Sequence, residues 1–132
     1  FTVGAELATK PDLRVHLLEH FPIVTEEMTT RLETLIDEIS GQITLPKAFI
    51  VPGGSQASAA IDIGRSAMRR AEREAIQLLD LEELANIEVP RYLNRLSDFL
   101  FMLARFEDRE HSFEALGSQS PIESLSKNSP ND

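Results

Sequence analysis

Three segments of this chain repeat their apolar residues with the period of an α-helix, and this pattern limits the fold more than any other feature of the sequence. In residues 25–41 the apolar stripe consists of Met28, Leu32, Leu35, Ile36 and Ile39. In residues 55–79 the expected buried face is mostly small, with Ala60, Gly64, Ala67, Ala71 and Ala75. After Pro90 a further stripe contains Leu93, Leu96, Leu100 and Leu103. No strand pattern or internal repeat stands out, so the sequence predicts an all-α protein, an antiparallel helix bundle.

The segments begin with residues that typically cap helices. Thr25 precedes two glutamates, which is an N-cap followed by first-turn carboxylates that suit the positive end of the helix dipole. Ser55 or Ser58 can cap the second long helix, and the prolines and glycines of residues 42–54 predict an extended loop before it. Residues 1–21 are interrupted by a proline and predict two short helical pieces.

The length of 132 residues is close to that of one domain, and we assign this domain to residues 1–114. From about residue 115 the chain is rich in Ser, Pro and Asn and has no apolar periodicity, which predicts a disordered polar tail over residues 115–132. The sequence starts at Phe1 without a methionine and reads like the interior of a longer protein. We therefore expect the domain to be N-terminally incomplete.

Charge and cysteine content exclude several classes of function. The 13 basic and 22 acidic side chains give a formal net charge of −9, which disfavours nucleic acid and anionic membranes as partners. The absence of cysteine excludes disulfide scaffolds and cysteine nucleophiles, and it fits a reducing compartment, so we expect a cytoplasmic protein. The longest uninterrupted apolar run, residues 99–104, is far shorter than the roughly 20 residues that a membrane span needs.

Arginines are concentrated on one predicted helix in spite of the acidic composition. The group consists of Arg65, Arg69, Arg70 and Arg73. An α-helix turns by about 100° per residue, which places Arg65, Arg69 and Arg73 on one face together with Glu72. The three arginines span about 12 Å along the helix axis. This length fits a polyphosphate, which guanidinium groups bind with two parallel hydrogen bonds. The alternative is a solvated face with ion pairs along the helix, such as Glu72 with Arg69.

Other candidate features allow more than one interpretation. Asn94 and Asp98 lie one turn apart on the last helix and could contact a sugar hydroxyl or orient a guanidinium, or they could simply belong to caps and salt bridges. Phe49 is either a core plug or a surface for a flat apolar ligand. Gly53-Gly54 could form an anion-binding nest or a plain turn.

Three blocks of sequence occur in an order and spacing that we recognise. They are Phe49-Ile-Val-Pro-Gly-Gly-Ser55, Arg65-Ser-Ala-Met-Arg-Arg-Ala-Glu-Arg73 and Tyr92-Leu-Asn-Arg-Leu-Ser-Asp-Phe-Leu-Phe-Met-Leu-Ala-Arg105. Together they resemble the PduO-type ATP:cob(I)alamin adenosyltransferases, and the resemblance extends over roughly residues 1–107. The segment before Arg65 reads Ile-Asp-Ile-Gly, so Asp62 stands where the family usually has histidine.

The resemblance implies a homotrimer of five-helix bundles with active sites between subunits. It implies transfer of the 5′-deoxyadenosyl group of ATP to the cobalt of cob(I)alamin, giving adenosylcobalamin and triphosphate. ATP and Mg²⁺ would bind as a substrate complex, cobalamin would be the second substrate, and no residue is assigned as a metal ligand.

The resemblance also implies roles for individual residues. The catalytic residues would be Arg65, Arg69 and Asn94. The substrate-binding residues would be Phe49, Arg69, Glu72, Arg73, Asn94 and Asp98. Arg69 would contact the phosphates, Arg65 would be held by an acidic residue of a neighbouring subunit, and Phe49 would pack under the corrin ring. Two other functions stay open, an inactive trimeric corrinoid-binding or assembly module and a helical interaction protein whose arginines form ion pairs between subunits.

Overall fold

A computed structural model describes residues 1–110 and 115–116 of the chain. Its helices are α1 (Thr2–Leu7), the 3-10 helix η1 (Pro11–Leu13), α2 (Arg14–His20), α3 (Glu26–Ser40), α4 (Gln56–Asp80) and α5 (Glu88–Glu107). The predicted all-α bundle is therefore confirmed, and the two helical pieces predicted before the long helices correspond to α1 and to the consecutive helices η1 and α2. None of the helices in this part of the chain combines the length and the apolar character that crossing a membrane requires.

One small sheet was not predicted. Strand β1 (Phe49–Ile50) pairs in antiparallel fashion with β2 (Ala115–Leu116), with Phe49 opposite Leu116. Strands of two residues are too short to show the alternation of apolar and polar residues by which strands are recognised. Strand β2 lies at the start of the predicted tail of residues 115–132, and residues 117–132 lie outside the described part.

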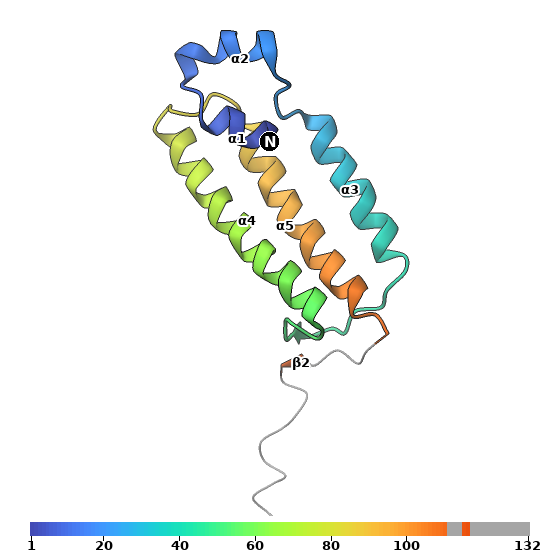
Figure 1. The fold of residues 1–132 in the computed structure, drawn as a ribbon. Coiled ribbons are helices and arrows are strands. Elements are labelled where there is room, and N and C mark those ends of the chain that lie inside the picture. Colours follow the sequence, from blue (N-terminus) through green and yellow to red (C-terminus); the bar gives the residue numbers. More distant parts are fainter. Residues whose placement is uncertain (111–114, 117–132) are drawn as a thin grey trace, which may run out of the picture.

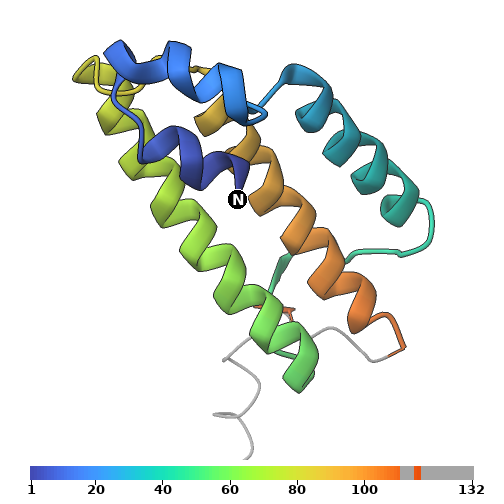
Figure 2. The ribbon, with the colours of Figure 1, turned by 45° about the horizontal axis from the view of Figure 1, so that its top comes forward.

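Helix α5 lies in the middle of the bundle, antiparallel to α4 on one side and next to α3 on the other (Figure 1). The short helices α1 and α2 lie across the end at which α4 finishes and α5 begins (Figure 2). The buried apolar core is near this end and consists of Val24, Ala75, Leu84, Val89 and Leu93. The opposite end of the bundle, where α4 begins and α5 finishes, carries the loop that leads from β1 into α4.

Helices α3 and α4 begin after the predicted N-cap residues, but only the cap of α4 is made by a side-chain hydrogen bond. Ser55 forms a reciprocal capping box with Ser58, in which each side chain accepts a hydrogen bond from the other residue's backbone N–H. Thr25 occupies the N-cap position of α3. A side-chain hydrogen bond with Thr25, assisted by the backbone of Glu27, lowers the pKa of the Glu27 carboxyl.

The small residues of α4 are buried to different extents. Ala75 is fully buried, and Gly64, Ala67 and Ala71 are half-buried. Ala60 is exposed, so its predicted burial is wrong. In the first turn of α4 the buried residue is Ser58, whose hydroxyl also donates to the Ser55 carbonyl at the cap.

A buried carboxylate ties the N-terminal helices to the bundle. Glu6 of α1 is almost completely buried and accepts hydrogen bonds from the backbone N–H of Val24 at 2.6 Å and from the Asn86 amide at 2.8 Å. The Asn86 amide also donates to the Val24 carbonyl at 2.9 Å, and its oxygen accepts from the backbone N–H of Glu88 at 3.1 Å. Asn86 thus joins α1, the start of α3 and the start of α5.

Replacement of Asn86 should therefore lower stability far more than replacement of an exposed amide. Asn86→Ala leaves buried groups of Glu6 and Val24 without a donor, and we expect a loss of about 2–3 kcal/mol in the free energy of unfolding. Urea denaturation of the purified chain measures this loss. Gln42→Ala is the matched control, because the Gln42 amide is exposed and, among the described residues, donates to the Glu38 carbonyl alone. Equal effects of the two substitutions would contradict the linking role of Asn86.

Candidate functional site

The antiparallel pairing of α4 and α5 places two of the sequence blocks next to each other. Asn94 of α5 donates a hydrogen bond from Nδ2 to Oε1 of Glu72 on α4 at 2.8 Å. Glu72 is half-buried and Asn94 is exposed, so the contact lies at the surface of the helix pair. The partner of Glu72 is thus Asn94, and the predicted alternative pair of Glu72 with Arg69 does not form in this structure.

Arg65 is the most enclosed of the four arginines on α4. Its guanidinium lies over the ring of Phe101 on α5, 5.3 Å from the ring centroid. The Nε atom of Arg65 is buried and has no hydrogen-bond partner within the described residues. A buried donor without a partner is costly, so this position would be stabilised by an acceptor from another molecule.

Arg69 and Arg73 point into solvent. Both side chains are exposed, and in the described ranges of the chain neither is paired with a carboxylate. Arg70, on a different side of α4, pairs with Glu74, with 4.0 Å between Nε and Oε1. Arg69 and Arg73 therefore keep their hydrogen-bond donors available for an anionic ligand.

Asp98 is engaged in a different contact from Asn94. Arg95 donates to Asp98 at 3.0 Å and also lies 3.0 Å from Glu33 of α3. The neighbouring Arg91 donates to Glu88 at 2.7 Å. Arg91 and Arg95 thus take part in ion pairs at the surface, and Arg95 links α5 to α3.

A groove of about 530 Å³ runs between α3, α4 and α5. Glu72 and Asn94 line it, whereas the other predicted site residues do not. Its remaining lining residues are Glu26, Thr29, Thr30, Glu33, Ile76, Leu79, Ile87, Glu88, Pro90, Arg91 and Arg95. The groove carries four carboxylates, and its two arginines are already paired, so it would repel a triphosphate. The exposed side of α4 that carries Arg69 and Arg73 is the better candidate for binding the phosphates.

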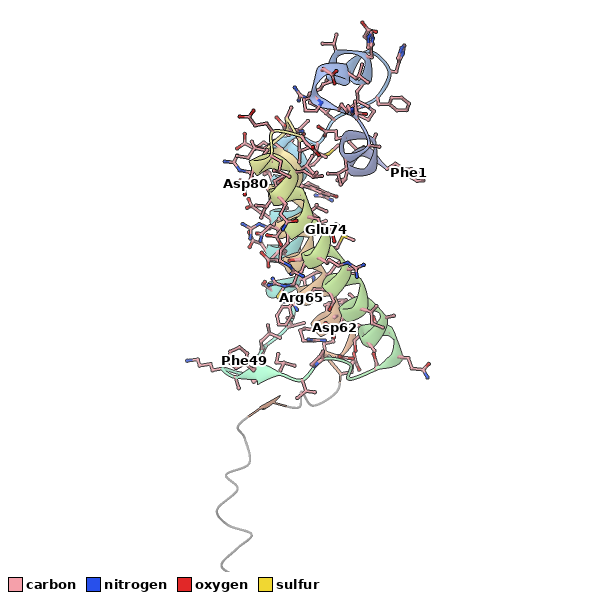
Figure 3. All side chains as sticks on the ribbon, turned by 90° about the vertical axis from the view of Figure 1, so that its left-hand side faces the viewer. Phe1, Phe49, Asp62, Arg65, Glu74 and Asp80 are labelled. Carbon is pink, nitrogen blue, oxygen red and sulfur yellow. The ribbon has the colours of Figure 1, made fainter. Side chains whose placement is uncertain are left out.

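Phe49 lies beyond the bundle, on the strand that precedes α4. Figure 3 shows Phe49, Asp62 and Arg65 toward the same end of the molecule. The Phe49 side chain is 84% exposed, so the interpretation as a core plug is wrong and that of an apolar contact surface is retained. Gly53 has φ +88°, and its backbone N–H donates to Asp62 at 3.2 Å, which favours a turn over an anion nest.

Sequence reasoning missed one charged residue near this end. Arg105 of α5 is only 1% exposed and donates from Nη2 to Oδ2 of Asp62 at 2.6 Å. Arg105 belongs to the third sequence block, but its burial could not be read from spacing, because its partner lies 43 residues away on another helix.

Residues 1–107 match the family model described as Cobalamin adenosyltransferase. The chain is 40% identical over 105 residues to a corrinoid adenosyltransferase of Bacillus subtilis, covering 80% of this chain and 51% of that protein. It is also 40% identical over 105 residues to corrinoid adenosyltransferase MMAB of Mus musculus, covering 79% of this chain and 44% of that protein. The chain thus spans about half the length of these relatives.

Solved structures show the same fold. A variant of a PduO-type ATP:corrinoid adenosyltransferase from Lactobacillus reuteri, complexed with cobalamin and ATP, superposes with a TM-score of 0.77 at 35% identity. This match covers 87% of the present chain and 62% of the other. A second variant from the same organism, complexed with ATP, gives a TM-score of 0.75 at 33% identity, with coverages of 87% and 63%.

The exposure of Phe49 predicts a small effect of its truncation on stability. Phe49→Ala should change the free energy of unfolding by less than about 0.5 kcal/mol, as is usual for an exposed position. Truncating a buried phenylalanine costs about 3–5 kcal/mol, so the two interpretations differ clearly in urea denaturation. A loss in the second range would show that Phe49 packs inside the folded protein.

Proposed function

Because this chain belongs to the cobalamin adenosyltransferase family, we propose that its protein transfers the 5′-deoxyadenosyl group of ATP to the cobalt of a reduced corrinoid. The observation that carries the proposal is the family match over residues 1–107, which includes all three sequence blocks. The geometry adds that α4 and α5 bring the arginine block and Asn94 together through the 2.8 Å hydrogen bond of Glu72.

The proposed reaction needs positioning and charge stabilisation from the protein. The electron pair of cobalt(I) attacks C5′ of the ribose, a carbon–cobalt bond forms, and the bond between C5′ and the phosphate oxygen breaks. Triphosphate leaves with the electrons of that bond. The nucleophile belongs to the corrinoid, so no serine, cysteine or histidine has to be activated.

Arg69 and Arg73 are suited to receive the departing triphosphate. Their guanidinium groups are exposed on α4 and free of carboxylate partners within the described part of the chain. Bidentate hydrogen bonds to phosphate stabilise the negative charge that develops as the bond breaks. Magnesium would enter together with the nucleotide as part of the substrate complex.

A homotrimer with active sites between subunits would provide contacts for a donor that is unpaired in the described part of this chain and for its exposed apolar side chains. An acidic residue of a neighbouring subunit would accept a hydrogen bond from Arg65, whose buried Nε lacks a partner in the described residues. Exposed apolar side chains such as Phe49 and Ile63 would then face substrate or another subunit. The absence of cysteine fits work in the cytoplasm.

The full-length protein should form adenosylcobalamin from ATP, Mg²⁺ and chemically reduced cobalamin. The absorbance change that accompanies formation of the carbon–cobalt bond measures the reaction, and light scattering measures the oligomeric state. A folded trimer that binds the corrinoid without turnover would favour an inactive binding or assembly module. A folded protein that binds neither substrate would support a purely structural role for the arginines.

Arg69→Ala should impair the reaction much more than Arg70→Ala. Removing a donor that stabilises transition-state charge raises the activation free energy calculated from kcat/KM by about 2–4 kcal/mol. Arg70 lies on another side of α4, where it pairs with Glu74, and its removal should cost less than about 0.5 kcal/mol. Steady-state kinetics of both variants measure the difference, and equal losses would indicate that the arginine block acts structurally.

A further inference from the structure

Arg105 lies at the centre of a buried charged cluster where α5 ends. Its Nη2 atom is 2.6 Å from Asp62 of α4 and 3.9 Å from Asp108, and both carboxylates are largely buried. The guanidinium lies 5.3 Å from the centroid of the Phe101 ring, which Arg65 also contacts at 5.3 Å. The cluster therefore adjoins Arg65 through a shared aromatic ring.

The same two carboxylates hold the loop between β1 and α4. Asp62 accepts a hydrogen bond from the Gly53 backbone N–H at 3.2 Å, and Gly53 has φ +88°, a conformation that favours glycine. Gly54 packs directly on Asp108, because a Cβ added at Gly54 would lie 2.7 Å from Oδ2 of Asp108. Two consecutive glycines thus contact two carboxylates, of which Asp62 is hydrogen-bonded to Arg105 and Asp108 lies 3.9 Å from it.

This loop determines where Phe49 lies. Only Ile50, Val51 and Pro52 separate Phe49 from the anchored Gly53, and proline restricts the backbone between them. The Phe49 side chain is exposed, so it is not held by packing in the described core, and its backbone is held by the two-residue pairing of β1 with β2 and by the loop that follows. The short connection from Phe49 to α4 therefore runs through Gly53, whose backbone N–H donates to Asp62 of α4.

Stability is a weak reason for burying this ion pair. Removing two charges from water is costly, and replacing such pairs by apolar side chains is often neutral or stabilising. A buried guanidinium that donates a short, directed hydrogen bond to Asp62 does, however, favour one geometry. Asp62 also accepts a hydrogen bond from the backbone N–H of Gly53, so the geometry of the ion pair also fixes the position of the loop.

We propose that Arg105 and Asp62 are positioning residues that fix the Phe49 loop against α4 for corrinoid binding. The proposal rests on the proposed function and on the role that the family resemblance implies for Phe49, which is to pack under the corrin ring. Asp62 orients the Gly53 N–H, Arg105 orients Asp62, and Phe101 lies between this cluster and Arg65. The pair thereby sets the loop that carries Phe49 relative to Arg65, which contacts the same Phe101 ring.

The test compares Asp62→Ala with Glu74→Ala in the full-length protein. Glu74 is a matched control, since it is a carboxylate of the same helix that pairs with an arginine but is exposed. Asp62→Ala should raise the KM for the corrinoid about tenfold, the usual effect of losing a hydrogen bond to a charged group, and leave the KM for ATP within about twofold. Glu74→Ala should change neither value.

Hydrogen exchange provides a readout without turnover. In Asp62→Ala, amides of residues 49–54 should exchange about tenfold faster, while amides of the α4 and α5 core keep their protection. Unchanged exchange in the loop, or faster exchange with an unchanged corrinoid KM, would overturn the proposal. A wild-type protein that fails to adenosylate cobalamin would instead overturn the proposed function, and the exchange result would still decide whether the loop is anchored.

A second variant covers the case in which Asp62→Ala fails to fold. Gly54→Ala keeps every charge but pushes the loop away from Asp108, so it should raise the corrinoid KM and leave the ATP KM unchanged. Gly64→Ala is its control, because a Cβ at Gly64 meets nothing within 4 Å. Equal corrinoid KM values for the two glycine variants would contradict the positioning role.

Discussion

The pairing of α4 with α5 is the interaction on which the rest of the structure depends. Half-buried Ala67 and Ala71 and fully buried Ala75 allow close approach along α4, and α5 contributes buried Ala104. Two polar contacts cross this interface, from Glu72 to Asn94 and from Asp62 to Arg105. The first joins the arginine block to the asparagine block, and the second joins the loop that carries Phe49 to the end of the bundle. The candidate site is thus a consequence of how two helices pack.

The helices were predictable because their signals are local. The apolar stripe of α3 and the capping box at Ser55 involve residues within a few positions of each other. The contacts between distant segments were not predictable in the same way. Glu6 and Asn86 are 80 residues apart, and nothing in either local sequence indicates that the carboxylate and the amide meet. Strand β1 also escaped prediction, because its partner β2 lies far along the chain and each has two residues.

For the candidate site, residue types were predictable and their surroundings were not. Helical geometry correctly grouped the arginines of α4, but it did not show that Arg65 lies over Phe101 while Arg69 is exposed. The sequence also left open whether Phe49 is a core plug or an apolar contact surface, and its exposure in the fold favours the contact surface. Asp62 looked like a simple departure from the family pattern. In the fold it is the partner of buried Arg105, so a change on α4 is understood only together with a residue of α5.

The hydrogen bond between Glu72 of α4 and Asn94 of α5 predicts that these two residues act together in the proposed reaction. A double-mutant cycle tests it most directly, with kcat/KM measured for Glu72→Ala, Asn94→Ala and the double variant. Since the two side chains share a 2.8 Å hydrogen bond, the losses should fall short of additivity by about 1 kcal/mol. Losses that add to within about 0.3 kcal/mol would show that the two residues act independently and would contradict this account.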